Sequence, residues 1–129
     1  QTSVLTESDH NYDMGSLFIS GDEWKVVGPT ERGPQKWGVG GELAIWQSKN
    51  KGKSWKKIKQ LTKNSKESHS YVRRPVNYKA PFCFFWADGN SHTLSKSELY
   101  FGDFDRNIWK LPYEMKNDFE KPVQVGKGK

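Results

Sequence analysis

Cysteine is nearly absent from this sequence, and long apolar runs are missing altogether. Its single cysteine, Cys83, excludes an internal disulfide framework and a cysteine-based zinc site. The three histidines, His10, His69 and His92, lie far apart along the chain, so we expect neither a metal nor another cofactor. No stretch is long and apolar enough to span a membrane, so membrane insertion is not expected. The first ten residues are polar, which argues against a signal peptide.

Hydrophobic residues make up only 33% of the 129 residues, but aromatic residues reach 14% and include six tryptophans. A chain with few Leu and Ile and many aromatics, Gly and Asn favours strands and turns over helices. The length suits one small domain with a real core. The 21 Lys and Arg exceed the 15 Asp and Glu, and the net charge of +6 suits an anionic partner: a nucleic acid, an acidic membrane surface or an acidic polysaccharide.

Short apolar runs alternate with turn clusters along the whole chain. Turn residues such as Ser20-Gly21-Asp22 and Gly28-Pro29 end the first two runs. Eight short strands separated by such turns predict an all-β fold. The expected strands cover residues 17–19, 24–27, 42–47, 55–61, 71–76, 82–87, 98–101 and 108–111.

The eight expected strands divide into two similar sets of four. Each set opens with His-x-Tyr, at residues 10–12 and 69–71. The third strands align as GELAIW and SELYFG, and the fourth strands align on Trp55 and Trp109. Tandem four-stranded antiparallel units of roughly 40–60 residues are typical of β-propeller blades. An eight-stranded sandwich with accidental similarity is the alternative. The blade interpretation divides the chain into a first blade at 10–62, a second blade at 69–115 and a C-terminal tail at 116–129.

The stretch SKNKGKSW at 48–55 fits the Asp-box spacing, Ser-x-Asp-x-Gly-x-Thr-Trp, of sialidase-type repeats. Asn50 replaces the Asp and Ser54 replaces the Thr. An Asn side chain bonds to backbone N–H groups further along a turn, and Gly52 permits a positive φ. The motif therefore predicts a turn between two strands. A catalytic role would need an ionisable group, and only lysines are near. Residues 102–109 hold a degenerate version that keeps the Trp.

Eight lysines fall between Lys49 and Lys66, with no acidic residue among them. A surface for nucleic acid would carry aromatic residues on the same face. Lysines on an outer strand prevent edge-to-edge pairing of sheets. We therefore interpret this run as a solvated outer edge and expect no nucleic-acid partner.

Several stretches, taken in order, resemble one family. HNYDMGSL, PTERGPQKWGVGGE, SKNKGKSWKKIKQLT, HSYVRRPVNY, FFWADG and SELYF are similar to the BNR-repeat proteins, which include β-propeller ulvan lyases. The resemblance extends roughly from His10 to Met115. It implies a secreted or periplasmic protein that acts on an acidic polysaccharide or glycan. Family members usually hold a whole ring of blades, so the resemblance also implies that further blades or identical chains complete the ring.

Blade geometry assigns each loop to one of two rims. The turn at 48–55 falls on one rim, and the expected ligand rim holds residues 10–13, 30–42, 69–74 and 88–92. A lyase acting on a uronate polymer needs a cation to neutralise the carboxylate, a base to remove the adjacent proton and an acid to protonate the leaving oxygen. Arginine suits the first role, and tyrosine or histidine suits the others. The catalytic candidates are His10, Tyr12, His69, Tyr71, Arg73 and Arg74, and the substrate-binding candidates are Glu31, Trp37, Glu42, Asp88 and His92.

Each candidate also has a structural interpretation. Residues on a strand alternate between its faces, so at most one of Arg73 and Arg74 points to a central channel and the other pairs with an acid between blades. Tyr71 is equally consistent with a packed aromatic of an inner strand. His10 and Tyr12 are equally consistent with a hydrogen bond between blades.

The substrate-binding candidates have alternatives of the same kind. Glu42 suits a ligand contact or an arginine of a neighbouring blade. Asp88 with Gly89 suits a simple turn, and Trp37, with Gly38 and Gly40 after it, suits a platform for sugar stacking. Three functions remain: a polysaccharide lyase, a glycan-binding module without turnover, and a sialidase-like hydrolase, whose arginine triad is not visible in this sequence.

Overall fold

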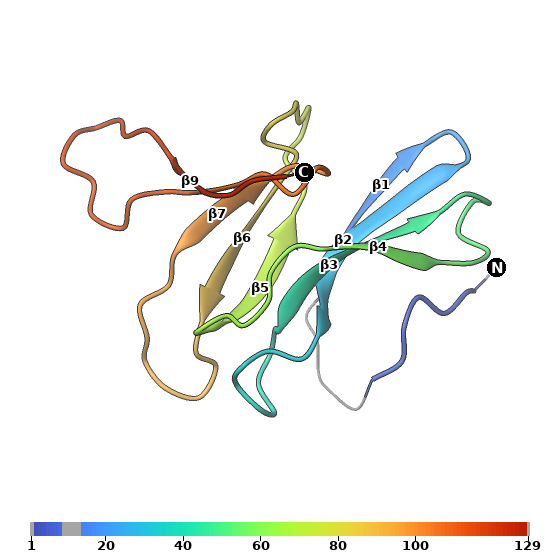
Figure 1. Cartoon of the computed structure of the whole chain (residues 1–129), viewed down its shortest axis with the longest axis horizontal. Helices are drawn as coiled ribbons and strands as arrows, with labels where there is room; N and C mark the ends of the chain where they lie inside the picture. The colour runs from blue at the N-terminus through green and yellow to red at the C-terminus, as the bar shows by residue number, and fades with distance from the viewer. Residues whose placement is uncertain (1, 9–13, 129) are drawn as a thin grey trace.

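The computed structural model describes residues 2–8 and 14–128, and these residues form nine strands and no helix (Figure 1). The chain is all-β, as predicted, and its two sheets are antiparallel throughout. The first sheet has the order β1 (Ser16–Ser20), β2 (Glu23–Glu31), β3 (Glu42–Ser48) and β4 (Lys56–Gln60). The second has the order β5 (Ser68–Arg73), β6 (Phe84–Gly89), β7 (Leu99–Gly102), β8 (Ile108–Lys110) and β9 (Val123–Gly126).

The prediction of two four-stranded sheets is wrong for the second sheet. The expected C-terminal tail contains β9, which pairs with β8 as a fifth strand. Two valines in an otherwise polar and largely exposed stretch gave too little apolar pattern to reveal it. Strand β5 also begins earlier than expected, at Ser68, and ends before Pro75, which has no N–H to donate to a ladder.

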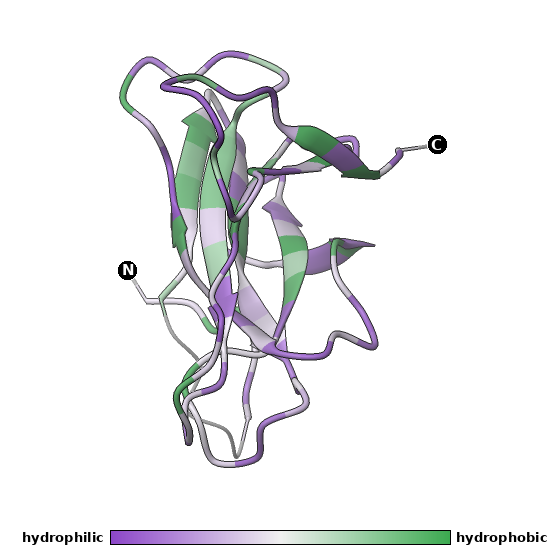
Figure 2. Cartoon of the chain, turned by 90° about the vertical axis from the view of Figure 1, so that its left-hand side faces the viewer, coloured by the Kyte–Doolittle hydropathy of each residue, from purple (hydrophilic) through white to green (hydrophobic). Residues whose placement is uncertain are grey.

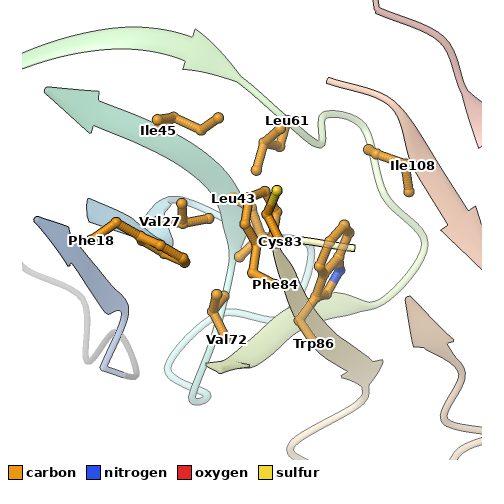
Figure 3. Packing of buried hydrophobic residues seen from close by; sticks show 10 residues of the cluster. All are labelled: Phe18, Val27, Leu43, Ile45, Leu61, Val72, Cys83, Phe84, Trp86 and Ile108. Atoms are coloured by element: carbon orange, nitrogen blue, oxygen red, sulfur yellow. The ribbon is translucent and has the colours of Figure 1, made fainter. Parts of the chain in front are cut away.

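The core lies between the two sheets. Alternating residues of the first sheet, such as Val27 and Ile45, meet alternating residues of the second, such as Phe84 and Trp86 (Figure 3). Burying one side chain of this size stabilises the fold by about 1.5–3 kcal/mol. Figure 2 shows hydrophobic residues mainly on the strands and hydrophilic residues on most of the connecting loops. The sheets meet along β5, which contacts β2 and β3.

Up-and-down connections place the loops at two ends of the sheets. At one end, the Lys51 N–H of the β3–β4 turn donates to the Asp22 carbonyl of the β1–β2 turn over 3.2 Å. We call this the Asp103 end, because the β7–β8 turn at 103–107 also lies there. The opposite, His69 end holds the loops 32–41 and 90–98, and there Gly41 and His69 exchange two backbone hydrogen bonds of 2.7 and 2.8 Å.

The turns at the Asp103 end repeat one hydrogen-bond pattern. The Ser48 hydroxyl accepts from the backbone N–H groups of Asn50 and Gly52, over 3.3 and 2.8 Å. The Asp103 carboxylate accepts in the same i+2 and i+4 positions, from Asp105 and Asn107, over 2.9 Å each. Asp103 therefore takes the place of Ser48 in the second sheet.

The alignment of Trp55 with Trp109 does not survive in the strand registers. The alignment of GELAIW with SELYFG places Ile45 opposite Phe101 as equivalent residues. Phe101 pairs with Trp109 on the next strand, but Ile45 pairs with Lys59 and not with Trp55. The second turn is shorter than the first, and its strand therefore begins at a different point of the sequence pattern.

Candidate functional site

The structure divides the predicted site residues into buried and exposed ones. His10 and Tyr12 lie outside the described residues. Glu42 and His69 are buried, and Asp88 is half-buried. Trp37 and Tyr71 are exposed.

His69 is held by a hydrogen bond at each ring nitrogen. The Trp86 indole N–H lies 3.0 Å from Nδ1, and the Ser65 hydroxyl lies 3.0 Å from Nε2. An indole N–H can only donate, so Nδ1 accepts and the proton of the neutral ring sits on Nε2. Burial lowers the pKa of His69, and the negative charges of Asp88 and Glu42 only oppose that shift. With both ring nitrogens engaged inside the chain, His69 of β5 is linked to β6 through Trp86 and to the linker between β4 and β5 through Ser65.

Glu42 continues this network. Its Oε1 accepts from the Ser65 backbone N–H over 2.8 Å, and its Oε2 accepts from the Ser65 hydroxyl over 2.8 Å and from the Thr62 hydroxyl. The donors all come from the linker between β4 and β5. Glu42 therefore fastens this linker to the start of β3.

Asp88 fixes the start of the β6–β7 loop. Its Oδ2 accepts from the Tyr100 hydroxyl and its Oδ1 accepts from the Glu98 backbone N–H, each over 2.8 Å. Burial, the bond to Asp88 and nearby negative charge together raise the pKa of Tyr100 strongly. Tyr100 is consequently a hydrogen-bond donor and cannot serve as a phenolate at neutral pH. Its ring stacks on Trp86, with centroids 5.5 Å apart.

A cleft of about 600 Å³ opens beside these groups at the His69 end. Burial favours the protonated Glu98, but its bonds to Lys110 and Tyr100 outweigh burial and the pKa of Glu98 is lowered. Both acidic and basic side chains therefore line the cleft. Its lining residues are Ser65, Lys66, Glu67, His69, Asp88, Ser95, Lys96, Glu98 and Tyr100.

Tyr71 has a strained and exposed position on β5. Its φ is 63° and its side chain is 56% exposed, although it lies within a strand. A positive φ is uncommon for a bulky residue, and such residues gather at functional sites. It coincides with an irregularity of the ladder between Ser70 and Arg73, which turns the ring out of the core. The Arg73 guanidinium carbon lies 3.7 Å from the centroid of the Tyr71 ring.

The two arginines lie away from His69. Arg73 is opposite Phe85 on β6, four residues beyond His69, which is about 13 Å along a strand. The Arg74 guanidinium carbon lies 5.8 Å from the Phe18 ring centroid, toward the Asp103 end. The structure therefore brings Tyr71 and Arg73 together but separates both arginines from the histidine.

Trp37 occupies the loop at the His69 end. It also has a positive φ, 64°, and is 67% exposed, and the Lys36 amine lies 4.9 Å from its ring centroid. His92 reaches the same loop through a contact between its Nε2 and the Lys36 carbonyl. Gly38 allows this close approach, because a Cβ there would collide with the Ser91 hydroxyl.

Glu31 forms an ion pair with Lys57. Its Oε1 lies 2.8 Å from the Lys57 amine, and both side chains are partly exposed, so the pair contributes about 1 kcal/mol or less. Glu31 also lines a second hollow of about 770 Å³, which shares Ser65 with the cleft.

Three residues of the candidate site were not predicted from the sequence. Ser65 lies in a polar linker without any periodic signal. Tyr100 could have been placed beside Trp86 from the strand alternation. Tyr113 is 57% exposed and has the Lys96 amine 4.0 Å from its ring centroid, which repeats the aromatic–cation pairing of Trp37 and Tyr71.

Comparisons with family models, curated proteins and solved structures give no match for this chain. Among residues 2–8 and 14–128, no group of three or more His, Cys, Asp or Glu side chains is arranged to hold a metal ion. In the same part of the chain, no helix has the length and apolar character needed to cross a membrane.

Proposed function

We propose that this chain is a carbohydrate-binding propeller module for an acidic polysaccharide. The observation that carries the proposal is the pairing of exposed rings with cations: Tyr71 with Arg73, Trp37 with Lys36 and Tyr113 with Lys96. An exposed ring offers the apolar face of a sugar a flat surface, and an adjacent cation offers its carboxylate a partner. The net charge of +6 favours the same class of ligand.

The blade interpretation is part of this proposal. Two consecutive antiparallel meanders that pack face to face support it, and so does the repeated hydrogen-bond pattern of the Ser48 and Asp103 turns. The additional strand β9 departs from the four-stranded blade. A polysaccharide ligand also makes a secreted or periplasmic location part of the proposal.

Binding to a uronate polymer such as ulvan tests the proposal, with a neutral glucan as the reference. We expect the chain to be retarded by ulvan in native affinity electrophoresis and to pass a neutral glucan gel unchanged. A Trp37→Ala/Tyr71→Ala double variant should bind at least about tenfold more weakly, the equivalent of about 1.4 kcal/mol.

Phe119→Ala is the matched control, because Phe119 is an exposed aromatic outside the three pairs. It should retain full retardation. Equal retardation of the double variant and the control would contradict the proposal, as would equal binding to the neutral glucan. Competition by single-stranded DNA at equal phosphate and carboxylate concentration would instead indicate a nucleic-acid ligand.

A lyase activity is the second candidate, and the Tyr71–Arg73 pair favours it. An arginine can neutralise the uronate carboxylate, and a tyrosine beside it is placed to act as the base that removes the neighbouring proton. Incubation with ulvan should then produce the ultraviolet absorbance of an unsaturated sugar. Tyr71→Phe should abolish that absorbance and keep the binding. An unchanged rate in Tyr71→Phe would remove Tyr71 from the mechanism.

A further inference from the structure

The positive charge of this chain is concentrated in one segment. Residues 49–66 carry eight lysines and no acidic residue. Of the 21 Lys and Arg, 13 therefore remain in the rest of the chain, where they stand against all 15 Asp and Glu and leave a net charge of −2. The net charge of +6 thus comes entirely from this segment, and so does the long-range attraction of an anionic ligand.

The segment follows one edge of the first sheet. It contains the turn after β3, strand β4 and the first residues of the linker to β5. β4 is the last strand in the order of its sheet, so among the described residues it pairs with β3 alone. In Figure 1 the green β4 continues into the linker that crosses to β5. We call residues 49–66 the lysine edge.

The lysines of this edge differ in their contacts. Three of them form ion pairs over 2.8–3.4 Å: Lys51 with Asp22, Lys57 with Glu31 and Lys59 with Asp105. Four others are exposed, and within residues 2–8 and 14–128 their amines take part in no ion pair, hydrogen bond or ring contact: Lys53, Lys56, Lys63 and Lys66. The fold therefore leaves these four charges to solvent or to a ligand.

Protection of the sheet edge explains only part of this charge. Lysines on an edge strand keep other strands from pairing with it. Lys53 lies in the turn before β4, and Lys63 and Lys66 lie in the linker after it, so these three have no strand edge to protect. The positive charge therefore continues beyond both ends of the strand, as a site for an extended ligand requires.

An extended polyanion is the kind of ligand that this edge suits. A single exposed pair of opposite charges contributes little to binding, because water and salt screen both ions. A polymer that carries many charges gains from several lysines at once and releases the counterions that surround it. β4 is extended and runs about 14 Å from Lys56 to Gln60, so a linear chain can lie along it.

The aromatic content of the edge favours a polysaccharide over a single-stranded nucleic acid. Single-stranded nucleic acids are held by bases that stack on aromatic side chains within a basic groove. Trp55 is the one aromatic residue in 49–66. It is half-buried, and its indole N–H donates to the Ser3 hydroxyl over 3.2 Å. The lysine edge thus offers charge without a row of stacking surfaces.

One end of the lysine edge reaches the proposed ligand surface. Lys66 lines the cleft at the His69 end together with Lys96, whose amine lies 4.0 Å from the centroid of the Tyr113 ring. The Lys66 carbonyl accepts from the Gln35 amide over 3.3 Å, and Gln35 precedes Trp37 in the same loop. A polymer bound along the edge can therefore continue toward the exposed rings at this end.

We propose that the lysine edge is a second binding site, which holds an acidic polysaccharide by its charge and complements the exposed rings. The proposal rests on the proposed function for the class of ligand and specifies that ligand further, as a linear polymer with closely spaced negative charges. The rings contact the sugars, and the edge contacts the charged groups. Affinity should therefore decrease steeply as the salt concentration rises.

Two variants of equal net charge test the site. The edge variant, Lys53→Gln/Lys56→Gln/Lys63→Gln, removes three unpaired charges from the lysine edge. The control variant, Lys79→Gln/Lys121→Gln/Lys127→Gln, removes three exposed charges outside both the edge and the ring–cation pairs. Isothermal titration with ulvan at about 50 mM salt should show at least about tenfold weaker binding for the edge variant and a change of less than about twofold for the control.

The salt dependence separates the edge from the rings. Titrations between about 50 and 200 mM salt give the slope of log affinity against log salt concentration, which should become shallower by up to about one for each edge lysine removed. The control variant and Trp37→Ala/Tyr71→Ala should keep the wild-type slope, because the edge is intact in both. Circular dichroism melts of the two lysine variants should match the wild type, since exposed side chains without partners are replaced.

The same measurements distinguish failure of the edge from failure of the rings. Equal affinities and slopes for the edge and control variants would overturn the lysine edge, while weaker binding of Trp37→Ala/Tyr71→Ala would still support the proposed function. Full binding by that ring variant, together with loss in the edge variant, would support the edge and contradict the role of the rings. A wild-type chain that does not bind ulvan at about 50 mM salt would overturn both proposals. Edge-dependent binding that is stronger to single-stranded DNA than to ulvan, at equal concentrations of charge, would overturn the choice of a polysaccharide.

Discussion

The polar and aromatic residues at the His69 end form two groups with different partners. His69 and Glu42 are buried and bonded to Trp86, Ser65 and the linker. Trp37 is exposed and paired with a cation at the surface. Burial thus goes with bonds that hold the sheets and the linker together, whereas the exposed Trp37 ring is open to the polysaccharide ligand that we propose.

The largest effect is expected from breaking the buried group at Trp86. Trp86→Ala removes a fully buried ring and leaves His69 without its donor. Loss of a buried Trp costs about 3–5 kcal/mol. Urea unfolding followed by circular dichroism should show this loss in the free energy of unfolding. Trp86→Phe should lose less, because it keeps a ring over Tyr100 and removes mainly the N–H. A cost below about 1 kcal/mol for Trp86→Ala would mean that the ring is not packed as described.

Substitution of Glu42 should lower the free energy of unfolding by a smaller amount. Glu42→Ala leaves the Ser65 N–H and hydroxyl and the Thr62 hydroxyl without their acceptor. Losing hydrogen bonds to a buried charged group costs about 2–3 kcal/mol. Glu31→Ala is the matched control, because its partly exposed ion pair should contribute about 1 kcal/mol or less. Equal unfolding midpoints in urea for the two variants would contradict the distinction between the buried and exposed groups.

The pH dependence of stability tests the buried histidine. The pKa of His69 is lowered in the folded chain, so acidification protonates the unfolded histidine near pH 6.5 before the folded one. Stability is therefore complete above pH 6.5 and falls below it, by at most about 1.4 kcal/mol per pH unit for one proton.

Urea unfolding between about pH 7.5 and 5.5 measures this slope before most carboxylates titrate. His69→Gln should flatten it, since an amide oxygen can still accept from the Trp86 N–H and does not titrate. A slope of the same size in His69→Gln would assign the effect to other groups.

The strands could largely be predicted from the sequence, whereas the partners of the site residues could not. The apolar residues from Leu43 to Trp46 located the strand that begins at Glu42, but β9 carries little apolar pattern. Ser65 bonds to Glu42 across 23 positions of chain, and no local spacing predicts such a contact.

The positions of the arginines also depend on the course of the strand. The sequence places 69–74 on one rim as a unit, but an extended strand carries its residues from one end of the sheet toward the other. Arg73 and Arg74 are therefore separated from His69. The outward turn of Tyr71 depends on a positive φ, which a tyrosine rarely adopts and its sequence neighbours do not signal.

The smallest effect on stability is expected at the exposed group, where the effect on binding should be largest. Trp37→Ala removes a ring that is mostly in solvent, and such substitutions usually change stability by no more than about 0.5 kcal/mol. The unfolding midpoint in urea should therefore remain near that of the wild type, while retardation by ulvan decreases. Glu42→Ala should do the reverse at temperatures where it is folded: lower the midpoint and keep the retardation. If Trp37→Ala lost stability and kept full retardation, the loop at the His69 end would belong with the buried group, and the ligand surface would have to be sought around Tyr71 and Tyr113 alone.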